Sequence, residues 1–107
     1  MVKFMVVLYR RPDISREHFR SYLREVHGPL AKRLPGVKKY TQNIPSHDPQ
    51  RKPPEWSGII ELYWENREAM EVAWASAEGR AATEDLGQFA DLTRTTWSTV
   101  DEFCIDV

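Results

Sequence analysis

The opening segment of the chain is apolar on both of its faces, and this restricts the fold more than any other feature. Val2 to Arg10 alternates as a β-strand does, and both sets of alternating side chains are largely apolar. A strand of this kind needs a cover on each side. We expect helices on one side, and on the other a second sheet that comes from this chain or from a partner.

The first helical pattern follows this strand. Ser15 is a suitable N-cap, and apolar residues then recur at helical spacing until Pro35-Gly36 ends the helix. Gly28-Pro29 interrupts the pattern, because proline lacks the amide that would bond to the carbonyl of Glu25. The sequence therefore predicts a kink or a fresh helix start at Gly28.

Strand and helix patterns alternate through the rest of the chain. We expect strands over residues 37–44, 58–64 and 99–107, one helix capped by Asn66 and ended by Gly79, and a shorter helix over 83–92. The order is βαββαβ. It predicts one α+β domain over residues 1–107, with a ferredoxin-like four-stranded antiparallel sheet and helices on one face.

The other face of this sheet would be bare and apolar. Met5, Val7 and Tyr9 share one face of the first strand, and Phe103 and Ile105 share one face of the last. An exposed patch of this kind is an association site. We expect a twofold homodimer in which two sheets pack face to face.

Composition excludes several classes of function. The 15 basic and 16 acidic residues leave a net charge of −1, which argues against nucleic acid or an anionic membrane as partner. No apolar run reaches the ~20 residues of a membrane span, and the first residues do not follow the charge order of a signal peptide. A cytoplasmic protein is expected. The single cysteine, Cys104, excludes an internal disulfide, and the three histidines lack metal-ligand spacing, so no metal site is expected.

His27 is the most informative titratable residue. It lies at the edge of the apolar helix stripe, beside the Gly28-Pro29 break, and from there it can reach a cavity between helix and sheet. A neutral imidazole in such a cavity can act as a general base near pH 7. The alternative is a structural histidine that binds freed carbonyl groups or the sheet. Tyr40 can present a phenol to the same cavity, or simply pack in its strand.

Other residues admit two interpretations each. Trp56, Trp64 and Trp74 can form an aromatic wall or belong to the core. Glu61 is either paired on the outer face or buried with a raised pKa. Asp85, expected near the start of the last helix, is most simply a partner of the helix dipole. Residues 45–56 contain four prolines and form a lid or a disordered flap.

Two short motifs resemble the EthD family. These are His27-Gly28-Pro29-Leu30 and Leu34-Pro35-Gly36-Val37, the second followed by Lys39-Tyr40-Thr41-Gln42-Asn43. The likeness extends over nearly the whole chain. It implies a dimeric α/β barrel built from two ferredoxin-like subunits, in agreement with the topology expected from the patterns.

The resemblance also implies a function. EthD-type proteins accompany the oxidative degradation of ethers and other small organic compounds, and relatives on this fold include methylmuconolactone isomerases, polyketide-modifying dehydratases and cofactor-free monooxygenases. His27 and Tyr40 match pocket positions of the isomerase branch. That branch has a cysteine where this chain has Leu62, and His47 is only a loose counterpart of its loop histidine.

We therefore interpret the chain as an enzyme for a hydrophobic, oxygenated small molecule, working by oxidation, isomerisation or dehydration without a tightly bound cofactor. His27 and Tyr40 are the expected catalytic residues, and the expected substrate-binding residues are Tyr22, Trp56, Trp64 and Trp74. One alternative is an accessory protein that binds a hydrophobic intermediate. Another is a haem protein with His27 as axial ligand.

Overall fold

One antiparallel sheet of four strands organises the molecule. The computed structural model describes all 107 residues and orders the strands β2-β3-β1-β4. Their bounds are Val2–Leu8 for β1, Lys39–Asn43 for β2, Gly58–Trp64 for β3 and Thr96–Val100 for β4. The predicted ferredoxin-like α+β fold is confirmed.

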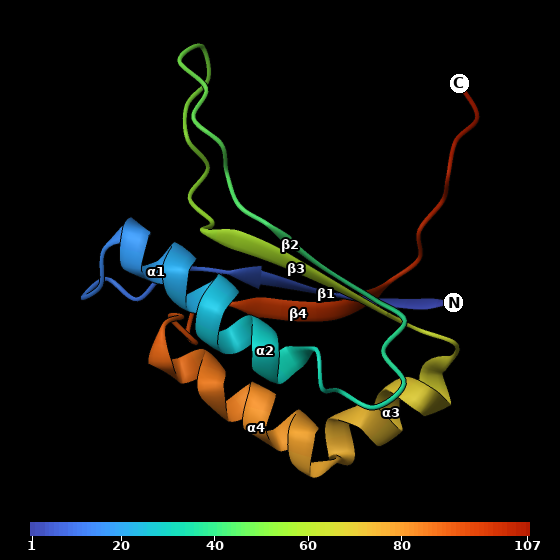
Figure 1. Cartoon of the computed structure of the whole chain (residues 1–107). Coiled ribbons are helices and arrows are strands. Elements are labelled where there is room, and N and C mark those ends of the chain that lie inside the picture. The colour runs from blue at the N-terminus through green and yellow to red at the C-terminus, as the bar shows by residue number, and fades with distance from the viewer.

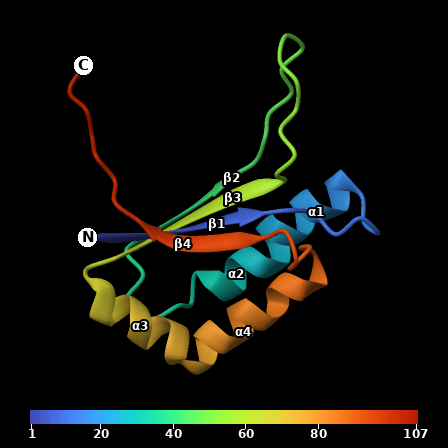
Figure 2. The same ribbon diagram turned by 180° about the vertical axis from the view of Figure 1, so that it is seen from behind.

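All helices lie on one side of this sheet (Figure 1). The first group consists of α1 (Arg16–Tyr22), the π-helical turn η1 (Leu23–His27) and α2 (Gly28–Ala31). The second consists of α3 (Arg67–Ala75), α4 (Ala77–Asp85) and the 3-10 turn η2 (Leu86–Gln88). The view from behind shows the same arrangement, with the opposite face of the sheet uncovered (Figure 2).

Two helices begin at the predicted N-cap residues, whose side chains cap the first turn. Ser15 accepts a hydrogen bond from the backbone amide of His18, and Asn66 accepts one from Ala69. The predicted interruption is also present, since a new helix begins at Gly28 with Pro29 in its first turn. The residues just before it form a π turn rather than a simple kink.

Gly79 does not end a helix, and this prediction was wrong. Ser76 ends α3 and caps α4, its hydroxyl accepting from the amide of Gly79, which lies inside α4. A Cβ at this position would collide with the carbonyl oxygens of Ala73 and Trp74. Glycine is present here because two helices approach closely, and the expected helix over residues 83–92 is the end of α4 followed by η2.

The last strand was also misplaced. Thr96–Val100 pairs with Val7–Lys3, so β1 has almost no residues left to pair with the chain beyond Val100. The expected strand over residues 99–107 therefore ends early. Its tail leaves the sheet, with Phe103 and Ile105 largely exposed rather than lying on the sheet face.

The core lies between the helices and the inner face of the sheet. Its largest fully buried side chains are Trp64, Phe19, Phe89, Leu8, Leu23 and Met70. The longest helices have nine residues each, and no helix reaches the length and apolarity that crossing a membrane requires.

Candidate functional site

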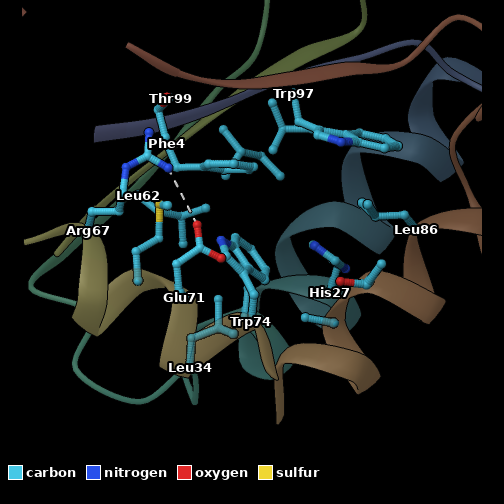
Figure 3. A pocket seen from close by; sticks show the side chains of 16 residues that line it. Phe4, His27, Leu34, Leu62, Arg67, Glu71, Trp74, Leu86, Trp97 and Thr99 are labelled. Atoms are coloured by element: carbon cyan, nitrogen blue, oxygen red, sulfur yellow. Dashed lines mark ion pairs between the residues drawn. The ribbon is translucent and has the colours of Figure 1, made fainter. Parts of the chain in front are cut away.

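An apolar cavity of about 430 Å³ lies between the sheet and the helices (Figure 3). Sixteen residues line it, and 11 of them are hydrophobic. The sheet contributes Phe4, Val6, Ile60, Leu62 and Trp97, and the helices contribute Ala31, Met70, Trp74 and Leu86. Its size and lining are typical of a site for a small organic molecule.

His27 is the buried titratable residue in the wall of this cavity. Only 3% of its surface is exposed, and its Nδ1 lies 3.0 Å from Oδ2 of Asp85. Because a carboxylate only accepts hydrogen bonds, Nδ1 carries the proton and Nε2 keeps its lone pair. Burial lowers the pKa of His27 below its ordinary value of 6.5, although Asp85 opposes this shift.

Asp85 holds a second partner. The hydroxyl of Tyr22 donates to Oδ1 of Asp85 at 2.7 Å, so one carboxylate joins a phenol and an imidazole. Burial and then Asp85 raise the pKa of Tyr22 to about 12, which keeps the phenol protonated. The interpretation of Asp85 as a dipole partner at a helix start was wrong, because this residue is the last of α4.

The π turn places His27 at the cavity. The amide of Gly28 donates to the carbonyl of Leu23, five residues earlier, which is the hydrogen bond of a π-helix. Gln42 of β2 donates to the same carbonyl at 2.9 Å. A Cβ on Gly28 would approach the Gln42 amide nitrogen to 3.1 Å, so glycine at this position leaves room for the link to the sheet.

Tyr40 lies behind this link and does not line the cavity. Its hydroxyl accepts from the side-chain amide of Gln42 at 2.8 Å, and burial raises the pKa of this phenol. The geometry thus connects Tyr40 to the π turn through Gln42. Tyr22 contacts the site in a similar way, through Asp85 and not through the cavity wall.

The three tryptophans, for which the sequence left an aromatic wall or the core open, lie in three different environments. Trp74 lines the cavity and packs against Phe4, with ring centres 5.1 Å apart. Trp64 is fully buried behind it and donates its indole N–H to the carbonyl of Pro35. Trp56 lies elsewhere, in a second hollow formed with α1 and the proline-rich loop.

The proline-rich loop does not cover the cavity. It extends away from the helices on the uncovered side of the sheet (Figures 1 and 2), and none of residues 45–56 lines the cavity. His47 belongs to this loop and to the second hollow. The interpretation of the loop as a lid over His27 does not fit this placement.

Several cavity residues were missed by the sequence reasoning. Trp97 was outside the predicted strand, because that strand was placed three residues too late. Arg67 and Glu71 were not singled out from the sequence, although they precede Trp74 by seven and three positions. That spacing sets all three on one face of α3, and this was the available signal.

The outer face of the sheet holds the other polar cluster. Glu61 is paired there with Lys3 and accepts from Thr41 and Asn43, which resolves the two interpretations of this residue. Lys3 holds the pKa of Glu61 below its ordinary value. No group of three or more His, Cys, Asp or Glu side chains is arranged to hold a metal ion.

Solved structures share this fold. An EthD-family protein from Bacillus halodurans superposes with a TM-score of 0.80 at 22% identity, over 96% of this chain and 100% of the other. A dimeric protein of ferredoxin-like fold from Bacteroides fragilis gives 0.68 at 14% identity, over 94% and 95%. SnoaB, a cofactor-independent oxygenase from Streptomyces nogalater, gives 0.66 at 13% identity, over 97% and 94%.

Sequence comparison identifies the family. No curated protein matches the chain with a significant score. The EthD domain, in contrast, matches residues 11–93, a stretch that contains the π turn, Gln42 and Asp85. The family resemblance noted in the sequence is confirmed, and the chain belongs to the EthD family.

Proposed function

We propose that this protein is an enzyme that transfers a proton on a hydrophobic, oxygenated small molecule, with His27 as the general base. One observation carries the proposal: a buried imidazole, oriented by a carboxylate, stands in the wall of an apolar cavity. Enzymes tune a base of this kind by burial and by a charged partner. Membership of the EthD family and the oxygenase on a similar fold support it.

The accessory-protein alternative has less support. A protein that only sequesters an apolar compound needs an apolar cavity, but it does not need a titratable residue there. Placing His27 in the wall carries a desolvation cost, which the lowered pKa reflects. The hydrogen bond to Asp85 orients the ring in addition. These features favour proton transfer over storage.

The chemistry follows from the protonation states. Nε2 of His27 takes a proton from a carbon or hydroxyl of the substrate, and Asp85 stabilises the imidazolium that forms. Returning that proton to another atom completes an isomerisation, and returning it to a departing hydroxyl completes a dehydration. Oxidation of the same substrate anion requires dioxygen as the electron acceptor. The proposed proton abstraction is common to all three reactions.

Tyr22 and Tyr40 act in this proposal by positioning. Tyr22 fixes Asp85, and Tyr40 fixes Gln42, which in turn fixes the π turn that ends at His27. Neither phenol lines the cavity. We therefore assign the catalytic contact to His27 and the orientation of its supports to the two tyrosines.

A homodimer through the outer face of the sheet is part of the proposal. Met5, Val7 and Ile59 share this face and are only half-buried. The proline-rich loop and the C-terminal tail both extend on the same side (Figures 1 and 2), where they would flank a second copy. The dimeric ferredoxin-like protein from Bacteroides fragilis supports this assembly.

The test uses exchange of hydrogen for deuterium, which does not require the natural substrate. 2-Tetralone is an apolar bicyclic ketone with acidic protons next to its carbonyl. In D₂O the native protein should accelerate deuterium incorporation into it. His27→Asn should reduce that acceleration by on the order of 10² or more, because asparagine cannot accept the proton near neutral pH.

His18→Asn is the matched control, because His18 is exposed on α1 and lies outside the cavity. It should exchange at the native rate. If His27→Asn instead retains native exchange and melts at a lower temperature, His27 is a structural residue and the proposed mechanism is wrong.

A further inference from the structure

The indole nitrogen of Trp74 is buried without a hydrogen-bond partner. It is the one buried side-chain nitrogen or oxygen in the molecule with no partner. An unpaired donor of this kind destabilises the folded protein, since it has left water and gained no hydrogen bond in exchange. Trp64, which packs against Trp74, shows the ordinary arrangement, because its N–H is bonded to the carbonyl of Pro35.

The surroundings of this nitrogen are polar on one side. Arg67, Glu71 and Trp74 lie on one face of α3 and all line the cavity. Figure 3 shows Arg67 and Glu71 on the side away from His27, with the Glu71 carboxylate next to the Trp74 ring. The cavity therefore has two polar regions, one at His27 and one on α3, separated by apolar side chains.

The charges on α3 determine whether a charged or a neutral oxygen of a ligand can bind beside Trp74. Arg67 is already paired with Glu71, its Nη1 lying 3.6 Å from Oε1, so the local charge is close to balanced. The negative charge of Glu71 would repel a ligand carboxylate, whereas a neutral oxygen carries no net charge to be repelled. The side chains of Arg67 and Glu71 are 68% and 60% exposed, so Glu71 can move aside and give an oxygen access to the indole.

We propose that Trp74 donates its indole N–H to a neutral carbonyl oxygen of the substrate. This rests on the proposed function and names its substrate class: an apolar ketone, ester or lactone whose carbonyl binds at α3 while its acidic hydrogen faces His27. A hydrogen bond from Trp74 would also stabilise the enolate oxygen that forms when His27 removes that hydrogen.

Two probes of nearly the same shape test the assignment. 2-Acetylnaphthalene carries a carbonyl, and 2-ethylnaphthalene has a methylene in its place. Isothermal titration calorimetry gives the dissociation constant of each, and their ratio measures the preference for the carbonyl. In Trp74→Phe this preference should fall about three- to tenfold, as expected for loss of one hydrogen bond from a neutral donor.

Trp97→Phe is the matched control, because Trp97 lines the same cavity from β4. It should leave the ratio unchanged even where both probes bind more weakly. The native protein provides a second measurement that does not depend on the variant folding. Its Trp74 indole proton resonance should move downfield with 2-acetylnaphthalene and not with 2-ethylnaphthalene.

The outcomes separate the two proposals. An unchanged ratio in Trp74→Phe, or equal indole shifts with both probes, overturns carbonyl recognition by Trp74 and leaves proton transfer by His27 standing. If neither probe binds the native protein, the cavity does not accept apolar ligands, and both proposals fail together.

Discussion

A polar pair on the outer face of the sheet and a polar pair in the helical layer behave in opposite ways. On the outer face, pairing with Glu61 raises the pKa of Lys3, and pairing with Lys3 lowers the pKa of Glu61, so both groups stay charged. In the helical layer, burial lowers the pKa of His27 even though Asp85 lies beside it. The outer pair therefore stays ionised near neutral pH. In the pair of His27 and Asp85, burial favours the neutral form of the imidazole, which is the form that the proposed base requires.

The difference arises from what surrounds each pair. Glu61 receives hydrogen bonds from Thr41 and Asn43 as well as from Lys3, and these favour its ionised form. His27 has one polar partner, and Phe89 packs against its ring at 5.1 Å. The same kind of contact, a base beside an acid, thus favours the ionised form of Glu61 in one place and leaves the neutral form of His27 favoured in the other.

The largest expected effect concerns Asp85. Asp85→Asn removes the charge that supports the imidazolium and offers an amide that can favour the wrong imidazole tautomer. The acceleration of deuterium exchange into 2-tetralone should fall on the order of 10². Glu61→Gln makes the same chemical change on the outer face and should exchange at the native rate. Equal losses in both variants would contradict the distinction between the two pairs.

The second expected effect concerns assembly through the outer face. Val7→Lys places a charge beside Ile59 in the apolar part of that face, once in each subunit of the proposed dimer. The dissociation constant should rise at least tenfold, because an apolar contact is replaced by two buried charges. Sedimentation velocity measures it, with Val72→Lys on the exposed side of α3 as control. Native protein that sediments at 12.5 kDa at micromolar concentration would show that the face does not pair.

A smaller effect is expected for Tyr22. Tyr22→Phe removes the hydrogen bond to Asp85, which should lower the free energy of unfolding by about 1 kcal/mol and the melting temperature by about 4–8 °C. Tyr63→Phe on the outer face is the comparison, since its hydroxyl makes one exposed contact of 3.3 Å with Glu102. Differential scanning calorimetry should find it close to native. An equal drop in melting temperature in both variants would show that the hydrogen bond from Tyr22 to Asp85 stabilises the fold no more than the exposed contact of Tyr63.

The last expected effect is a difference in pH dependence. The pKa of His27 is lowered in the folded protein, so unfolding takes up a proton and stability falls as pH drops below 6.5. The slope is at most about 1.4 kcal/mol per pH unit for one proton. Glu61 has a lowered pKa as well, so its contribution is complete above 4.5 and falls only below that pH.

Urea unfolding at a series of pH values separates the two groups. His27→Asn should remove the loss that begins near pH 6.5, and Glu61→Gln should remove the one that begins near pH 4.5. His18→Asn, at an exposed position, should leave both losses of stability unchanged. A native slope in His27→Asn between pH 5 and 6.5 would show that the uptake belongs to another group.

The fold was predictable because its signals are local. Ser15 and Asn66 cap helices through their own side chains, and Gly28-Pro29 starts a helix through the geometry of two residues. The alternation of side chains along Val2–Leu8 indicates a strand without reference to the rest of the chain. Each of these signals lies within a stretch of at most seven residues.

Most of the errors came from features that depend on distant residues, and the error at Gly79 came from the junction between two consecutive helices. Gly79 permits a close contact between α3 and α4, which looks the same in sequence as a helix stop. The end of β4 is set by where β1 runs out of partners. Asp85 and His27 are 58 positions apart, so only the packing of α4 against η1 reveals their pairing. The sequence indicated His27, whereas its partners required the structure.

The π turn that ends at His27 makes the length of this segment unusually hard to change. An α-helix advances about 100° per residue, so removing one residue between Leu23 and His27 would restore ordinary helical hydrogen bonding at the cost of rotating the two flanking segments against each other. Either the apolar stripe of α1 or the imidazole would then leave the interior. Substitutions can accumulate along this helix. A one-residue deletion, in contrast, would produce a regular α-helix but would displace the site. Homologues that keep this site are therefore expected to keep the π turn as well.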